Sequence, residues 1–122
     1  MNVKSMTPVL RTWDLAGSRE FYEQVLGFKC DVYEPEAGWA MLTYGAGSIM
    51  LTGPNEHEGD RGPAFTGSLY FRIDDADDLW ARLKDQVRIC YPIETFEYGM
   101  REFAIYDGNG YLLQFGQAVH DG

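Results

Sequence analysis

Two segments of the chain carry apolar residues at helical spacing, and each begins at an aspartate. In the first, roughly 14–26, the residues that share one face are Ser18, Phe21, Tyr22, Val25 and Leu26. Asp14 offers an N-cap oxygen to this segment, and Gly27 fits the C′ position at which such helices end. In the second, Asp75 precedes a face formed by Ala76, Leu79, Trp80 and Leu83. The pattern predicts two amphipathic helices.

The other apolar residues lie mainly in short β-rich runs on either side of a polar segment, 54–66. The runs before it are 7–13, 28–33, 39–44 and 48–52, and those after it are 68–73, 88–96, 101–106 and 111–115. The turn sequence Asp107-Gly108-Asn109-Gly110 joins the last two runs. The predicted order is therefore β-α-β-β-β, a loop, and β-α-β-β-β again.

The two halves repeat each other. Asp14 and Asp75 are 75 − 14 = 61 positions apart, half of the 122 residues, and an offset of this kind indicates internal duplication. We predict a single α+β domain over 1–122, with two tandem βαβββ modules, roughly 5–53 and 67–117, and a linker over 54–66. Each module would form a curved mixed sheet with a helix on its outer face, and the two sheets would surround a concave cleft.

Composition and charge exclude some classes of partner and favour others. Ten Lys and Arg against 19 Asp and Glu give a net charge of −9, which argues against nucleic acid and anionic membranes and suits a cationic ligand. The two cysteines, Cys30 and Cys90, are too few for a disulfide scaffold, and we expect both to pack as small apolar side chains. Because no segment has the apolar pattern of a signal peptide or a membrane span, we expect a cytoplasmic protein.

Two longer motifs carry a resemblance to a known family. TPVLRTWDLAGSREFYEQVLGF at the start and GMREFAIYDGNGYLLQFGQ at the end resemble the glyoxalase/bleomycin resistance protein/extradiol dioxygenase (vicinal oxygen chelate) superfamily. The segment with Gly99, Arg101, Glu102, Phe103 and Ala104 looks most similar to its bleomycin-resistance-like, metal-free branch. That resemblance implies an antibiotic-like ligand bound at the interface of a homodimer, and it leaves open whether strands are exchanged between subunits.

The resemblance also implies where a metal would lie. The positions that match the metal ligands of the superfamily's enzymes are occupied here by Thr7, Met50, Ser68 and Gln114. A divalent ion needs imidazole, carboxylate or thiolate ligands, usually three or more, and these four side chains offer only weak neutral donors. We therefore expect no metal, no other cofactor and no catalytic residue at this place, while enzymatic activity as such stays open.

Strand alternation indicates which side chains would line the cleft. If Ser68 points inward, Tyr70 and Arg72 do so too, and inward-facing Gln114 and Met50 would join them. Aromatic residues near strand ends and an acidic residue complete the expected contacts. The candidate ligand-binding residues are Trp39, Met41, Met50, Phe65, Ser68, Tyr70, Tyr98, Glu102 and Gln114.

These residues favour metal-independent binding or sequestration of a small hydrophobic or cationic aromatic molecule. The alternatives are a lyase, isomerase or dioxygenase-type enzyme of the same fold, or a non-catalytic interaction module. Another donor cluster, Asn55-Glu56-His57-Glu58 with Asp60, lies on a loop without regular spacing, and His120 lies near the end of the chain. We expect both to be solvated surface.

Overall fold

The structure, a computed structural model, describes residues 1–55, 59 and 61–119. It divides the chain into two units, Met1–Ala64 and Phe65–Gly122. Each unit contains one four-stranded sheet and one principal helix. In the part of the chain that is described, neither helix is long and apolar enough to cross a membrane.

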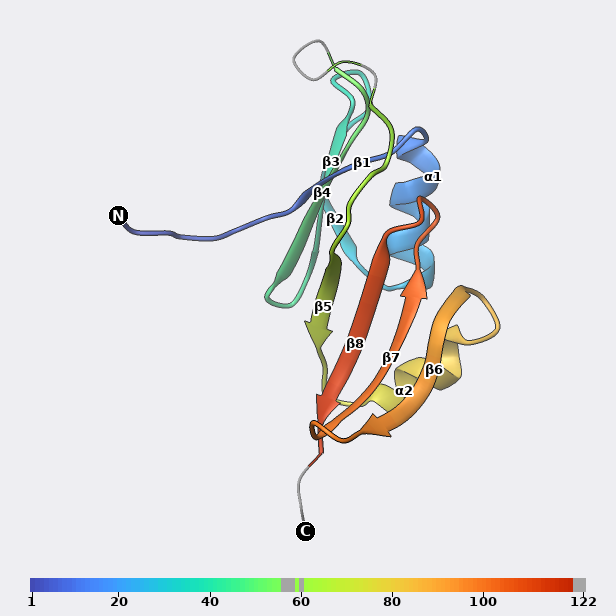
Figure 1. The fold of residues 1–122 in the computed structure, drawn as a ribbon. Helices are drawn as coiled ribbons and strands as arrows, with labels where there is room; N and C mark the ends of the chain where they lie inside the picture. Colours follow the sequence, from blue (N-terminus) through green and yellow to red (C-terminus); the bar gives the residue numbers. More distant parts are fainter. Residues whose placement is uncertain (56–58, 60, 120–122) are drawn as a thin grey trace. The chain divides into compact units, whose positions relative to one another are not determined.

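The first unit forms a mixed sheet in the order β1-β4-β3-β2 (Figure 1). Its elements are β1 (Val9–Arg11), α1 (Leu15–Glu20), the π-helical turn η1 (Phe21–Val25), β2 (Lys29–Glu34), β3 (Trp39–Tyr44) and β4 (Gly47–Thr52). Strands β1 and β4 are parallel, and the two hairpin pairs are antiparallel. The parallel pair brings the first strand of the unit next to its last.

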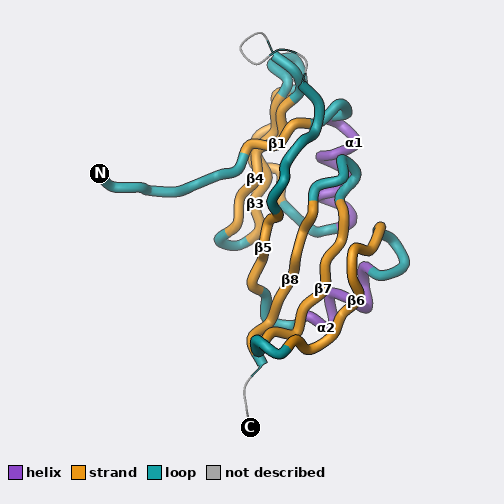
Figure 2. Tube along the Cα trace, in the orientation of Figure 1, coloured by secondary structure: helices purple, strands orange, loops and turns teal. Residues whose placement is uncertain are grey.

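The second unit repeats this topology in the order β5-β8-β7-β6 (Figure 2). Its elements are β5 (Ser68–Arg72), α2 (Ala76–Leu83), β6 (Arg88–Phe96), β7 (Met100–Tyr106) and β8 (Leu112–Ala118). Here β5 and β8 are the parallel pair. The predicted α+β class with tandem βαβββ modules is confirmed, whereas the homodimer stays a prediction.

Both helices start where the sequence indicated. Oδ1 of Asp14 accepts the amide N–H of Gly17 at 3.0 Å, and Oδ1 of Asp75 accepts that of Asp78 at 3.0 Å. The first helix differs from the expected regular helix over 14–26, because its second half is π-helical. Gly27 follows with a φ of +83°, which permits the chain to turn into β2.

Each sheet packs one face against its own helix. In the first unit the buried side chains of this layer include Leu10, Tyr22, Ala40, Leu42, Ile49 and Leu51. In the second, aromatic rings connect the helix to the sheet, with Trp80 against Phe103 at 5.3 Å between centroids and Phe103 stacked on Phe115 at 5.3 Å. The opposite face of each sheet, called its open face below, is left for other contacts.

The cysteines do not both pack as expected. Cys30 is half-buried and Cys90 is exposed, and both thiols are free. A register irregularity between Ile89 and Tyr91 places Cys90 outside the regular pairing of β6 with β7. The apolar surroundings that predicted a packed Cys90 do not bury it, because the regular strand pairing is interrupted there.

Candidate functional site

The open face of the first sheet carries an apolar row that crosses all four strands. Cross-strand register places these side chains next to one another, in the order Val9, Met50, Met41 and Val32. Trp39 lies in the next row, between Thr52 and Glu34. Val9 and Val32 are exposed, and Met41, Met50 and Trp39 are half-buried. The sheet therefore presents soft and aromatic side chains that its own helix does not cover.

Hydroxyl groups border this row on one side. The Thr7 and Ser48 hydroxyls lie 2.7 Å apart, and the Thr43 hydroxyl donates to Oδ2 of Asp31 at 2.8 Å. On the other side Nη1 of Arg11 donates to the carbonyl oxygen of Gly53 at 2.8 Å. The polar groups that flank the row are thus engaged within the unit, and the row itself offers van der Waals contact and stacking.

The open face of the second sheet is chemically different. A carboxylate, Glu102, lies on β7 with only 2% of its surface exposed. Tyr70 donates its hydroxyl to Oε1 at 2.7 Å, and Tyr91 and Tyr98 donate theirs to Oε2 at 2.5 and 2.8 Å. These four residues are called the tyrosine–glutamate cluster below. Three phenols from three different segments thus meet at one buried charge.

Two further side chains extend the cluster along the sheet. Nε2 of Gln114 donates to the Tyr91 hydroxyl at 3.0 Å, and the Ser68 hydroxyl donates to Oε1 of Gln114 at 2.6 Å. The chain of donors runs in one direction, from Ser68 to Glu102. Hydrogen bonds aligned in this way polarise and strengthen one another.

The cluster keeps its charge on the glutamate. Burial raises the pKa of Glu102, but the hydrogen bonds from Tyr91, Tyr70 and Tyr98 outweigh burial, so its pKa lies below the usual value. Burial and the hydrogen bond to Glu102 raise the pKa of all three tyrosines. At neutral pH the cluster therefore holds one carboxylate and three neutral phenols.

A glycine makes this arrangement possible. Gly116 on β8 lies between Arg72 of β5 and Glu102 of β7 in the register of the sheet. A Cβ atom at this position would lie 2.0 Å from the Tyr70 hydroxyl and 2.7 Å from its Cζ. Because glycine has no side chain, the Tyr70 ring crosses β8 and reaches Glu102.

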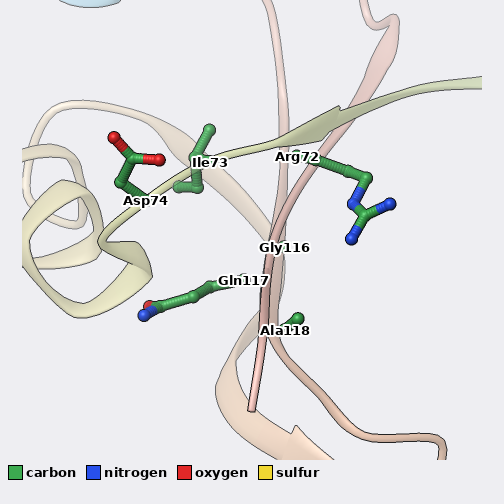
Figure 3. Close-up of a pocket in the computed structure, with 6 residues that line it drawn as sticks. All are labelled: Arg72, Ile73, Asp74, Gly116, Gln117 and Ala118. Carbon is green, nitrogen blue, oxygen red and sulfur yellow. The ribbon is translucent and has the colours of Figure 1, made fainter. Parts of the chain in front are cut away.

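A shallow pocket of about 350 Å³ lies at the end of the same strands (Figure 3). The residues that line it are Arg72, Ile73, Asp74, Gly116, Gln117 and Ala118. Figure 3 shows that Arg72 extends to the opposite side of β8 from Gln117. The Gln117 side chain is already used, since its Oε1 accepts the amide N–H of Ala76 at the start of α2.

Comparison with known proteins identifies the family. The family model described as Glyoxalase/Bleomycin resistance protein/Dioxygenase superfamily matches residues 6–115. The chain belongs to this superfamily. No curated protein sequence matches the chain.

Solved structures resemble the chain over nearly its whole length. An integron cassette protein from V. cholerae is 27% identical with a TM-score of 0.72, covering 96% of this chain and 97% of its own. TioX from Micromonospora sp. ML1 is 20% identical with a TM-score of 0.77, covering 96% and 100%. Lactoylglutathione lyase from Agrobacterium tumefaciens is 17% identical with a TM-score of 0.71, covering 96% of each. The last two likenesses establish the fold alone.

The residues at the superfamily's metal positions do not fit a metal. Thr7 and Ser68 present hydroxyls that are hydrogen-bonded to Ser48 and Gln114, and Met50 presents a thioether to the apolar row. Neutral donors of this kind do not found a divalent-metal site. Among the described residues, no three His, Cys, Asp or Glu side chains are grouped to hold an ion. Residues 56–58 and 60 and His120 lie outside the described part.

The structure distributes the predicted ligand-binding residues over two surfaces. Trp39, Met41 and Met50 share the open face of the first sheet. In the second unit, Tyr70 and Tyr98 are hydrogen-bonded directly to Glu102. Ser68 and Gln114 are connected to Glu102 through Tyr91. Phe65 lies before β5, outside the strands, with its ring against Gly67.

Sequence reasoning missed two members of the second surface. Tyr91 belongs to the cluster, and the Phe96 ring stacks on Tyr98 at 5.4 Å with an interplanar angle of 6°. Register shifts in β6 on both sides of Tyr91 bring it opposite Ala104, on the open face. Simple alternation from Arg88 places Tyr91 on the other face. A Pro at position 92 was the available signal of irregular pairing.

Proposed function

We propose that this chain binds a small, partly planar organic molecule without the help of a metal, and that binding itself is its function. The observation that carries the proposal is the apolar row on the face of the first sheet opposite its own helix, with the Trp39 indole beside it. Contiguous apolar surface of this kind is typical of ligand sites. The fold that the chain shares with TioX and the lyase is compatible with this use.

Soft side chains suit a planar guest. Met41 and Met50 are neighbours across β3 and β4, and their unbranched thioethers adapt to ring faces. The indole of Trp39 offers a stacking surface that contributes about 0.5–1.5 kcal/mol beyond area burial. Together these side chains supply affinity. Sequestration requires affinity alone and needs neither proton transfer nor a nucleophile.

A thermal-shift screen tests the proposal. Glycopeptide, quinoxaline and other planar antibiotics are the probes, and the melting temperature of the parent is compared with that of Trp39→Ala, Tyr98→Ala and Tyr44→Ala. Tyr44 is the control, because its exposed ring contacts Phe28 and lies on the alternate, helix-facing parity of β3. We expect a hit to raise the melting temperature of the parent and Tyr44→Ala, with an affinity about tenfold lower for Trp39→Ala.

Two outcomes would contradict binding as the function. If no planar compound shifts the melting temperature, the first sheet is not a ligand surface for this class. If purified protein carries at least about half an equivalent of a transition metal and converts substrate only when loaded, the chain acts as a metalloenzyme of the superfamily.

A further inference from the structure

We propose that the open face of the second sheet holds a subsite for an organic ammonium group, formed by Tyr70 and Tyr98 over the buried carboxylate of Glu102. This inference rests on the proposed function, metal-free binding of a small organic molecule, and it concerns the second unit by itself. It adds the chemical class of the ligand and the side chains that select it.

Every hydrogen bond of the tyrosine–glutamate cluster is donated toward Glu102. All three phenols donate to Glu102, and Gln114 and Ser68 donate in turn behind Tyr91. A hydroxyl that has donated its single proton has only lone pairs left to offer a ligand. The phenol and serine oxygens are therefore acceptors toward an incoming molecule. Acceptors of this kind favour a ligand that brings N–H donors or positive charge.

Aromatic faces lie beside these oxygens. Tyr70 is 43% exposed and Tyr98 is 62% exposed, although both hydroxyls reach the buried carboxylate. Phe96 stacks on Tyr98 from one side, which fixes the ring and leaves its other face available. A ring face is negative, and donation of the phenol proton to an anion increases that electron density. Cations, and alkylammonium groups above all, bind such faces.

Two further carboxylates lie near the subsite. Glu94 lies opposite Glu102 in the register of β6 and β7, and Glu97 is exposed in the turn that follows. Two cations lie on this face: Arg72, whose exposed side chain lies on the opposite side of β8 from Gln117 (Figure 3), and Arg88, whose guanidinium lies over the Tyr106 ring at 4.5 Å from its centroid. In the described part of the chain no Lys or Arg forms an ion pair with Glu102. The buried carboxylate thus attracts a cation that the protein itself does not supply.

A pair of isosteric probes separates charge from shape. Choline and its neutral carbon analogue 3,3-dimethylbutan-1-ol have the same bulk, and their binding to the full chain is measured by isothermal titration and by NMR shifts of the tyrosine rings. We expect choline to bind at least about fivefold more tightly than the alcohol, because only the cation gains from the ring faces and from Glu102. Equal binding of the two probes would overturn the inference.

Two matched substitutions locate the subsite. Tyr98→Leu changes a tyrosine that is 62% exposed, and Tyr44→Leu makes the same change at a tyrosine of the first unit that is 57% exposed. We expect Tyr98→Leu to lose the preference for choline and Tyr44→Leu to keep it. Glu102→Gln, which keeps the side-chain shape without the charge, should reduce the preference by at least about threefold. A preference that survives Tyr98→Leu would place cation recognition elsewhere and end the proposal.

The outcome also distinguishes this inference from the proposed function. If choline fails to bind while a planar antibiotic still shifts the melting temperature through Trp39, only the ammonium subsite is wrong. If neither kind of probe binds, the proposed function fails with it.

Discussion

A single buried carboxylate determines the chemistry of the second sheet. Glu102 has almost no exposed surface and no guanidinium or ammonium partner among the described residues, yet it stays ionised because three phenols donate to it. Hydrogen bonds to a charged acceptor are stronger than those between neutral groups. The tyrosines thereby take the place that a salt bridge has in other buried sites. They leave the negative potential available on the open face.

The charge of Glu102 should make stability depend on pH. Because its pKa is lower in the folded chain than the usual value, the carboxylate stabilises the fold fully above that usual value and loses this contribution as pH falls through the folded pKa. We expect Glu102→Gln to lower the free energy of unfolding by about 2 kcal/mol at pH 7 and by progressively less below about pH 4. Urea unfolding at a series of pH values measures the difference.

A second glutamate provides the control for this experiment. Glu94 lies opposite Glu102 on the neighbouring strand, but its side chain is exposed. Glu94→Gln should change the free energy of unfolding by no more than about 0.5 kcal/mol at any pH tested. A Glu102→Gln deficit that stays constant from pH 7 to strongly acidic pH would show that the lost contacts do not depend on the charge.

At the scale of elements, the sequence predicts the repeated strand–helix order well and the interior of β6 poorly. The limits of β3 and β6 agree with the predicted runs 39–44 and 88–96, because β-rich residues fill both. The register of β6 against β7, by contrast, was not predicted. The shifts on either side of Tyr91 depend on the pairing with β7, which a local pattern does not contain. For the same reason alternation found Ser68, Tyr70 and Gln114 but not Tyr91.

The crossing of the Tyr70 side chain over β8 could not be predicted from the local sequence pattern either, because it depends on Gly116 of a neighbouring strand. In Gly116→Ala the new methyl group would occupy the position of the Tyr70 hydroxyl, so the ring must leave Glu102. We expect a loss of about 1–2 kcal/mol in the free energy of unfolding. The pKa of Tyr70, which burial and the bond to Glu102 raise, should fall toward the usual value near 10. Chemical unfolding and ultraviolet titration of the phenols measure the two effects.

Gly108→Ala is the matched control for this change. A Cβ atom at Gly108 would meet nothing within 4 Å, and this glycine does not have a positive φ. We expect its stability and its phenol titration to match those of the parent. Equal behaviour of the two alanine variants would mean that Tyr70 does not depend on the gap at position 116.

For the whole molecule, duplication has kept the topology and changed the chemistry. Trp39 on β3 is joined through Thr52 to Arg11, and Glu102 on β7 is joined through Gly116 to Arg72. The two modules thus have an indole and a carboxylate at corresponding places. One open face is suited to stacking and the other to positive charge.

The superfamily's metal positions follow the same duplication, since Thr7 corresponds to Ser68 and Met50 to Gln114. We expect chelation of the parent to change its melting temperature by less than about 1 °C, because hydroxyls, a thioether and an amide contribute no metal-linked stability. Zn²⁺ added to the parent should likewise leave its melting temperature unchanged. If a chelator lowers the melting temperature of the parent by several degrees, a bound metal contributes to the stability of its folded state.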